Sequence, residues 1–192
     1  MFNQFQLIAE CRSFVLLFSF VFILQGCATM NQDECLTADW LSIGERDGIR
    51  GKTENMFESR ASACAKHGVT ADRSAYKDGY NSGLREFCLP NNGYKNGLDK
   101  IEYHYVCPID QQSAYLREYV KGLNLAISEL DFELRKLDID YRSAEISLNS
   151  ASTEDEIKSA EKRLRRLKTE VDNLDYEYDT LRNWLNIAIG QM

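Results

Sequence analysis

Cysteine and histidine are the residues of this 192-residue chain whose types and spacing could do chemistry. Cys64 stands three residues before His67, and His104 stands three residues before Cys107. Together the two pairs could supply the four tetrahedral ligands of a zinc ion. Neither spacing is a recognised zinc-finger pattern, and in an oxidising compartment the same thiols would form disulfides instead. The choice therefore depends on where the protein resides.

Catalysis has little support in the sequence. His67 and His104 are the two histidines of the chain, and no nucleophile motif accompanies either of them. Serine and acidic residues are frequent, but no spacing makes them converge. We predict that the chain is not an enzyme and that it needs no cofactor or metal.

An apolar run from Phe14 to Leu24 indicates export. Its eleven residues fall well short of the roughly 20 that a membrane-spanning helix needs. A short apolar run that follows a positive residue, here Arg12, and ends in small residues is typical of a secretory signal. We therefore predict that residues 1–26 are a signal peptide.

The run closes with Leu24-Gln25-Gly26-Cys27, which resembles the lipobox of bacterial lipoproteins. The resemblance implies that the Cys27 thiol receives a diacylglyceryl group, that cleavage makes Cys27 the first residue, and that its amine is then acylated. Two or more acyl chains anchor a protein stably in a lipid bilayer. In such lipoproteins the residue after the lipidated Cys directs sorting, and Ala28 at this position, where Asp would retain the protein elsewhere, implies the outer membrane. The mature chain would then face the periplasm, with residues 27–34 as a tether.

Four further cysteines remain in the mature chain, namely Cys35, Cys64, Cys88 and Cys107. An even number in a small exported domain predicts a disulfide framework. Three pairings are possible, and we favour the nested one, Cys64 with Cys88 and Cys35 with Cys107. Each bridge would contribute about 2–4 kcal/mol, which matters for a small head domain at residues 35–110.

Glycines in this head domain follow aromatic residues at helical spacing. Three glycine pairs stand four residues apart: Gly44 and Gly48, Gly79 and Gly83, Gly93 and Gly97. A helical glycine costs about 1 kcal/mol relative to Ala, but such a pair clears one helix face for a close neighbour. The pattern predicts short helices packed on tyrosine rings. The alternative is a shallow aromatic groove for a sugar or peptide, lined by Trp40, Tyr76, Tyr80 and Tyr94.

Spaced motifs extend through the same segment, beginning with Trp40-x-x-Ile43-Gly44-x-x-Asp47-Gly48 and ending with Tyr103-x-x-x-Cys107-Pro108. They resemble an uncharacterised family of bacterial lipoproteins with a domain of unknown function. The resemblance covers residues 35 to about 123, and it implies export and lipidation without supplying an activity. Phe87 stands where the family pattern leads us to expect Tyr.

Local signals place the elements of the head. We expect helices around 36–51, 55–66 and 72–86. The sequence Leu89-Pro-Asn-Asn-Gly93 predicts a turn, and residues 102–106 could form a short strand.

The second half of the chain reads as a helical hairpin. Apolar residues from Leu116 to Leu148, and again from Ile157 to Ala188, alternate at spacings of four and three, the signature of a coiled coil. Thr153 and Glu156 between them form a capping box, which starts a new helix. Because the loop is short, the two helices must be antiparallel. We therefore predict a mainly α protein, in which a small disulfide-stapled helical head precedes a long antiparallel coiled-coil hairpin at 111–190.

Charges on the two arms support this register. Folding the chain about residues 151–152 brings three acidic residues of the first arm near three basic residues of the second: Asp138 near Arg165, Asp140 near Arg163, and Glu145 near Lys158. Each arm of roughly 33 residues would reach about 50 Å. The hairpin would either project from the head or fold back on it.

The net charge of the chain limits which kinds of molecule it could bind. A net charge of −7 argues against nucleic acid and against electrostatic docking on anionic lipid. We predict a structural or adaptor protein of the outer membrane that docks on an envelope protein through its hairpin. The alternatives are a periplasmic module whose Tyr/Gly-rich head binds a peptidoglycan fragment or peptide, and a lipoprotein that only strengthens the envelope.

Overall fold

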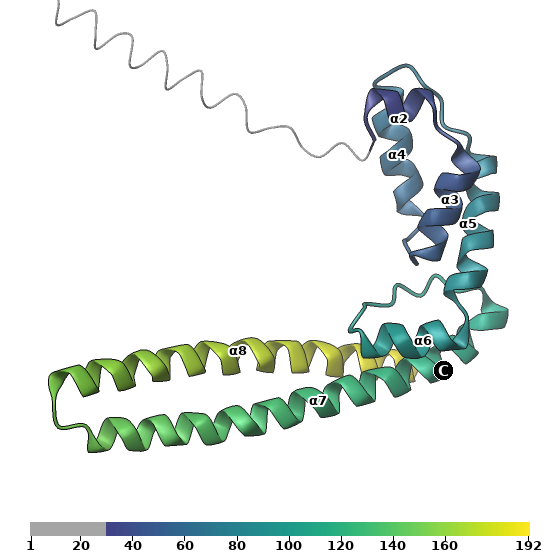
Figure 1. Ribbon diagram of the computed structural model, residues 1–192. Coiled ribbons are helices and arrows are strands. Elements are labelled where there is room, and N and C mark those ends of the chain that lie inside the picture. The colour runs from purple at the N-terminus through teal and green to yellow at the C-terminus, as the bar shows by residue number, and fades with distance from the viewer. Residues whose placement is uncertain (1–29) are drawn as a thin grey trace, which may run out of the picture. The chain divides into compact units, whose positions relative to one another are not determined.

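The computed structural model describes residues 30–192, which form seven helices and no strand within that range (Figure 1). The predicted signal peptide and Cys27 lie outside the described residues. The described chain falls into two compact units. One comprises Phe57–Ala71 with the described residues up to Ala38, and the other comprises Asp39–Met56 with Asp72–Met192. The expectation of a mainly helical protein with a disulfide-stapled head and a long helical hairpin is confirmed.

The first unit is held by a disulfide between α2 (Gln32–Leu36) and α4 (Asn55–Ala65). Cys35 and Cys64 are both buried, with their Cα atoms 5.3 Å apart. A capping box begins α2, in which Asn31 accepts a hydrogen bond from the backbone N–H of Glu34. The helix therefore starts inside the segment 27–34 that we predicted to be a tether.

The second disulfide joins Cys88 to Cys107, with their Cα atoms 5.6 Å apart. The nested pairing predicted from the sequence is therefore wrong, and each cysteine bonds to the next one along the chain. The first bridge, over 29 residues, encloses α3 and most of α4, and the second, over 19 residues, encloses α6 and the loop after it. The nested pairing would have required contacts between cysteines that belong to different compact units.

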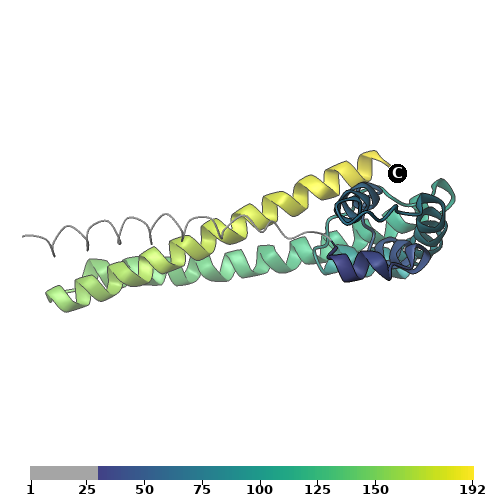
Figure 2. The ribbon, with the colours of Figure 1, turned by 90° about the horizontal axis from the view of Figure 1, so that it is seen from above.

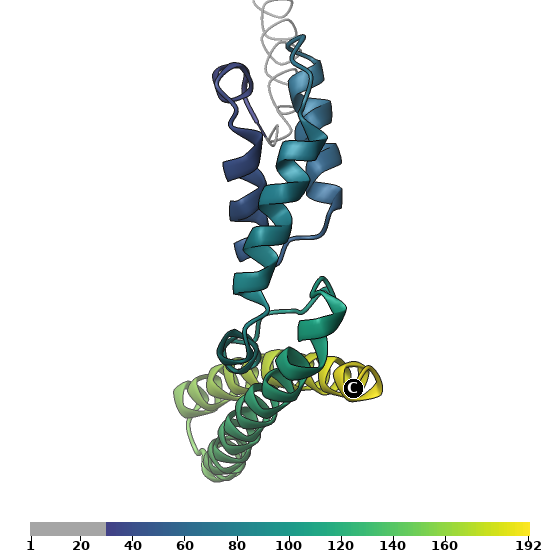
Figure 3. The same cartoon turned by 90° about the vertical axis from the view of Figure 1, so that its right-hand side faces the viewer.

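Helix α3 (Trp40–Ile49) packs along α5 (Arg73–Phe87) in the second unit (Figure 3). Both helices begin after an aspartate whose side chain accepts a backbone hydrogen bond, from Ser42 in α3 and from Ala75 in α5. Such side chains satisfy the first free N–H groups of a helix. The cap at Asp39 explains why α3 starts four residues later than the sequence suggested.

Helix α6 (Pro90–Leu98) packs on α7 (Ile109–Ser150). The predicted turn at 89–93 is wrong, because Pro90 occupies the first turn of α6, where its missing N–H costs nothing. The predicted strand at 102–106 is also wrong. That segment is an irregular loop, in which Tyr105 takes a positive φ of 58° and Cys107 is tied to Cys88.

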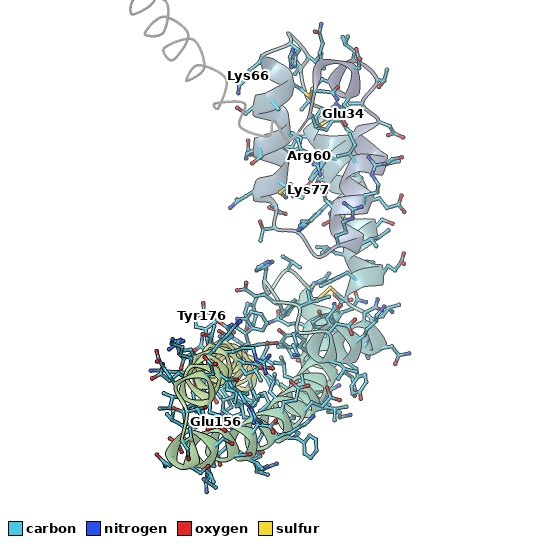
Figure 4. All side chains as sticks on the ribbon, turned by 60° about the vertical axis from the view of Figure 1, so that its left-hand side comes forward. Glu34, Arg60, Lys66, Lys77, Glu156 and Tyr176 are labelled. Carbon is cyan, nitrogen blue, oxygen red and sulfur yellow. A yellow bond between two sulfur atoms is a disulfide. The ribbon has the colours of Figure 1, made fainter. Side chains whose placement is uncertain are left out.

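Helices α7 and α8 (Glu154–Gly190) form the predicted antiparallel hairpin (Figures 1 and 2). The Thr153–Glu156 capping box is confirmed, and Glu156 lies at the turn (Figure 4). Buried seam residues follow the predicted spacing on both helices: Leu116, Leu123, Ile127, Leu130, Leu137 and Ala144 on α7, and Ala160, Leu167, Leu181, Leu185 and Ala188 on α8. Burial of these residues, each worth on the order of 1 kcal/mol or more, is what holds the arms together.

Ion pairs contribute little to this hairpin. Of the three predicted pairs between the arms, the structure contains one, Arg163 with Asp140, at 4.0 Å. Arg165 and Lys158 instead pair with acidic residues one turn away on their own helix. Because i,i+4 partners are always within reach and exposed pairs are worth under about 1 kcal/mol, charge does not fix the register. The apolar seam does.

Candidate functional site

Glycines allow α3 and α5 to touch backbone to backbone. A Cβ atom on Gly44 or Gly48 would collide with the carbonyl oxygen of Tyr76 or Tyr80 on α5. The contact is reciprocal, because Cβ atoms on Gly79 and Gly83 would collide with carbonyl oxygens of α3. Two glycines four apart on each helix therefore make this crossing possible.

Glycines of α6 and α7 produce a second crossing with the same contacts. A Cβ atom on Gly97 would meet the carbonyl oxygen of Tyr119 and the backbone of Gly122, just as one on Gly48 would meet Tyr80 and the backbone of Gly83. In this correspondence α6 stands for α3, and α7 stands for α5.

Tyrosine hydroxyl groups confirm the correspondence. Tyr80 donates a hydrogen bond to the carbonyl of Lys52 at 2.6 Å, four residues after Gly48. Tyr119 donates to the carbonyl of Ile101 at 2.9 Å, four residues after Gly97. Each hydroxyl thus ties the second helix of its pair to the chain leaving the first helix.

A second tyrosine stacks on the first in each pair. The rings of Tyr76 and Tyr80 lie 6.0 Å apart with a 12° interplanar angle, and those of Tyr115 and Tyr119 lie 6.0 Å apart with 17°. The hydroxyl of Tyr76 donates to the buried Asp47 at 2.9 Å. The corresponding hydroxyl of Tyr115 accepts from Asn96 Nδ2 at 2.9 Å.

The end of the first helix is also alike in the two pairs. Gly51 and Lys100, each three residues after the second glycine of the pair, have positive φ values of 61° and 58°. The next residue donates its N–H back to the residue just before that glycine in both cases, at 3.0 Å to Asp47 and 2.9 Å to Asn96. The head thus contains one structural pattern twice. Its sequence signal is Tyr-x-x-x-Tyr-x-x-Gly-Leu, which occurs on both α5 and α7.

Burial disfavours the charged form of three of these tyrosines. Burial raises the pKa of Tyr80 to about 12 and raises the pKa of Tyr115 and Tyr119 further still. A tyrosine that acts as an acid or base needs the opposite shift, toward the working pH. The rings therefore serve packing and hydrogen bonding.

The candidate groove residues do not line one open surface. Trp40, Tyr76 and Tyr80 are buried, whereas Tyr94 on α6 is 38% exposed. The structure brings Tyr76 and Tyr80 together in one stack and places Tyr94 on the other helix pair. The contacts agree with the prediction of helices packed tightly on tyrosine rings. The sequence places Tyr119 and Gly122 in the same aromatic–glycine series as the residues of α5. Sequence reasoning missed Tyr115 and its stacking on Tyr119, because it assigned this stretch of α7 to the hairpin.

The candidate zinc ligands are used otherwise. Cys64 and Cys107 are in different disulfides, so neither offers a thiolate. Within residues 30–192 no group of three or more His, Cys, Asp or Glu side chains is placed to hold a metal ion.

Exposed apolar side chains form a regular line on the outer face of α7. Leu125, Phe132, Ile139 and Ile146 stand seven residues apart and are between 41% and 69% exposed. We call these four residues the outer stripe. They occupy the heptad position opposite the seam with α8, where the corresponding residues of α8 are Lys162, Thr169, Tyr176 and Asn183. The heptad register could have revealed the stripe from the sequence.

Comparison with protein families gives one match. Residues 39–124 match the family described as protein of unknown function (DUF2799). The DUF2799 segment contains the glycine contacts of both helix pairs and ends one residue before the outer stripe. Comparisons with curated proteins and with solved structures found no match. Among the helices of residues 30–192, none combines the length and the apolar character needed to cross a membrane.

Proposed function

We propose that this protein is a lipid-anchored envelope protein that holds other molecules in place, as an adaptor or structural component, and does no catalysis. Support for export comes from the Leu24-Gln25-Gly26-Cys27 sequence and from the two disulfides, because disulfides persist in oxidising compartments such as the periplasm.

The outer stripe is the observation that carries this proposal. Proteins leave regular rows of large apolar side chains in water mainly where another molecule binds them. The stripe also lies beyond the DUF2799 segment, on an arm whose seam with α8 is already complete. Folding of the hairpin therefore does not account for the stripe, and an interaction does.

The start of the described chain fits an anchored head. Four residues, 28–31, separate Cys27 from the first residue of α2, and an extended chain spans at most about 3.5 Å per residue. The first unit would therefore lie within about 20 Å of the anchor. The 42 residues of α7 extend about 63 Å, a length that exceeds the span of these four residues.

Membrane anchoring is tested by changing the anchor residue. Cys27→Ser removes the thiol that would be lipidated, so the variant should move from the membrane fraction to the soluble fraction and lose incorporation of labelled palmitate. Wild-type protein that carries no palmitate would contradict the anchor.

The interacting arm is tested by crosslinking in intact cells. A photoreactive amino acid at Ile139 should give discrete adducts after irradiation. The same amino acid at Tyr176, an outer position on α8 whose side chain is also exposed (Figure 4), is the matched control and should give none of these adducts. Equal patterns from the two positions would contradict a binding role for the stripe.

A further inference from the structure

We infer that the outer stripe is the contact surface of a symmetric dimer, in which α7 of one copy packs antiparallel on α7 of a second copy. The inference rests on the proposed function, in which the hairpin is the interacting arm, and it names the partner. It is carried by the stripe together with the charges beside it.

The stripe has the length that such a contact needs. From Leu125 to Ile146 the helix advances about 31 Å, and all four apolar side chains lie on the face opposite the α8 seam. A specific interface buries at least roughly 1,000 Å² in total. Four large apolar side chains from each copy, with the charged residues beside them, supply area of that order.

If a two-fold axis passes near Arg135 and Lys136, the stripe of one copy packs against the stripe of the other. Phe132 then lies beside Ile139 of the second copy, and Leu125 lies beside Ile146 of the second copy. In a two-fold interface each contact occurs twice, so every apolar residue of the stripe has an apolar neighbour.

On one flank of the stripe, the order of charges favours pairing with an antiparallel copy of the same helix. Asp131, Arg135, Asp138 and Arg142 alternate in sign along α7. When a second α7 runs antiparallel, Asp131 faces Arg142 of the second copy, and Arg135 faces Asp138 of the second copy. These contacts join opposite charges and give four ion pairs across the dimer. The two copies of Arg135 also approach each other at the axis, where Asp131 and Asp138 of the same helix lie on either side of each arginine.

The same four residues already form ion pairs within α7, and they can exchange these partners for residues of a second copy. Arg135 pairs with Asp131, and Arg142 pairs with Asp138, both at 2.7 Å within α7 and both at the exposed surface. Exposed pairs of this kind are worth under about 1 kcal/mol. A change of side-chain rotamer is therefore enough to exchange a partner on the same helix for a partner on the second copy.

The other flank favours the same orientation. Lys136 lies near the axis beside Lys136 of the second copy, and it also lies between Glu133 and Asp140 of that copy. Parallel packing would instead bring the acidic Asp131 and Asp138 against the acidic side of the second α7. Like charges placed opposite each other oppose that orientation.

A bilayer is a poorer occupant of the stripe. A helix that lies in a membrane interface presents an apolar face of about 100° or more. The outer stripe is one residue wide, with charged residues such as Arg135, Lys136 and Arg142 at the adjacent positions. A narrow ridge with alternating charges matches a helix.

Sedimentation equilibrium of the full-length chain in a density-matched non-ionic detergent tests the dimer. The wild type should have twice the monomer mass. Phe132→Gln combined with Ile139→Gln should raise the dissociation constant by about a hundredfold or more, with unchanged circular dichroism because both side chains are exposed. Tyr176→Gln on α8 is the control and should remain dimeric. A wild-type monomer, or a dimer that survives the double change, would overturn the inference.

A charge exchange tests the antiparallel register. Arg135→Asp places like charges opposite each other twice per dimer and should weaken association about tenfold. Adding Asp138→Arg restores opposite charges at both contacts and should recover the wild-type dissociation constant. Failure of the second change to restore association would overturn the antiparallel pairing.

The two proposals fail in different ways. If the wild type is monomeric but Ile139 still gives crosslinks to another protein in cells, the dimer is wrong and the arm remains an interaction surface. If neither a dimer nor a crosslink from Ile139 is found, the proposed function fails with it.

Discussion

The α3–α5 and α6–α7 helix pairs share one pattern of contacts and differ at three places. Where α5 has Gly79, α7 has Glu118, whose side chain is partly exposed and pairs with Lys121, so three glycines are enough for the second crossing. Where the first pair buries Asp47, the second has Asn96. The third difference is length, because α5 ends four residues after its last glycine whereas α7 continues to Ser150.

The features that both helix pairs share are those that the close crossing requires, and the features found in one pair are additions to it. Close backbone contact, a stacked tyrosine pair and a hydroxyl bond to the outgoing chain are present twice, so they define the pattern. The long arm and the outer stripe occur once, on the second pair. The arm is therefore an extension of a helix that the crossing already positions.

Widening the crossings should have the largest effect. Gly48→Val and Gly97→Val each place a side chain against a tyrosine carbonyl of the facing helix, so each should lower the free energy of unfolding by more than about 3 kcal/mol. Gly190→Ala, where the added Cβ meets no atom within 4 Å, should change stability by under about 1 kcal/mol. Urea unfolding followed by circular dichroism measures all three. A tolerated Gly97→Val would show that the second crossing does not depend on close contact.

Removing one disulfide should come next. Cys88→Ser combined with Cys107→Ser opens a loop of 19 residues and should cost about 3 kcal/mol. Because the bridge joins the starts of α6 and α7, hydrogen exchange should rise in the second pair more than in α3 and α5. Equal loss of protection in both pairs would mean that the two pairs unfold as one.

High pH should weaken both pairs. The folded-state pKa of Tyr80 is about 12 and those of Tyr115 and Tyr119 are also raised, because burial disfavours the charged form. In the unfolded chain a tyrosine loses its proton near pH 10. The stabilisation is therefore fully present below about pH 10 and is lost as the pH rises through 12, by about 1.4 kcal/mol per pH unit for each such tyrosine.

Unfolding measured from pH 9 to pH 12 checks this expectation. Tyr80→Phe removes one titrating group from the first pair, and Tyr119→Phe removes one from the second. Each variant should show a shallower decline than the wild type. An unchanged slope in either variant would contradict the buried, neutral state of that tyrosine.

The smallest expected effect is the difference in stability between losing the tyrosine hydrogen bond to Asp47 and losing the one to Asn96. Tyr76→Phe removes a hydrogen bond to an acidic side chain, which is worth about 2 kcal/mol, whereas Tyr115→Phe removes one to a neutral amide, worth about 1 kcal/mol. Urea unfolding of the two variants should therefore show the larger loss in the first pair. Equal losses would indicate that the carboxyl of Asp47 and the amide of Asn96 are interchangeable in this pattern.

Local sequence signals predicted the hairpin well. The four-three spacing of apolar residues and the Thr153–Glu156 capping box depend on residues within one or two helical turns. Such signals can be read without knowing the fold. The glycine pairs likewise indicated close helix contacts, although the spacing did not say which helices would meet.

The repeated pattern of the head was visible in the sequence but was not recognised. Tyr115 and Tyr119 fell inside a coiled-coil series that already explained the residues around them. The first part of α7 packs on both α6 and α8. An interpretation based only on the coiled-coil spacing assigns this part of the helix to the contact with α8.

By itself, the sequence determined the two long helices of the hairpin, the turn between them, an even set of cysteines and the apolar seam. Only the tertiary structure decided which cysteines bond, that Tyr76 and Tyr80 are buried and not in a groove, and that the cations of the arms pair mostly within their own helix. Disulfides and burial depend on contacts between residues far apart in the chain. Whether those residues meet is set by the packing of whole helices, which no local spacing contains.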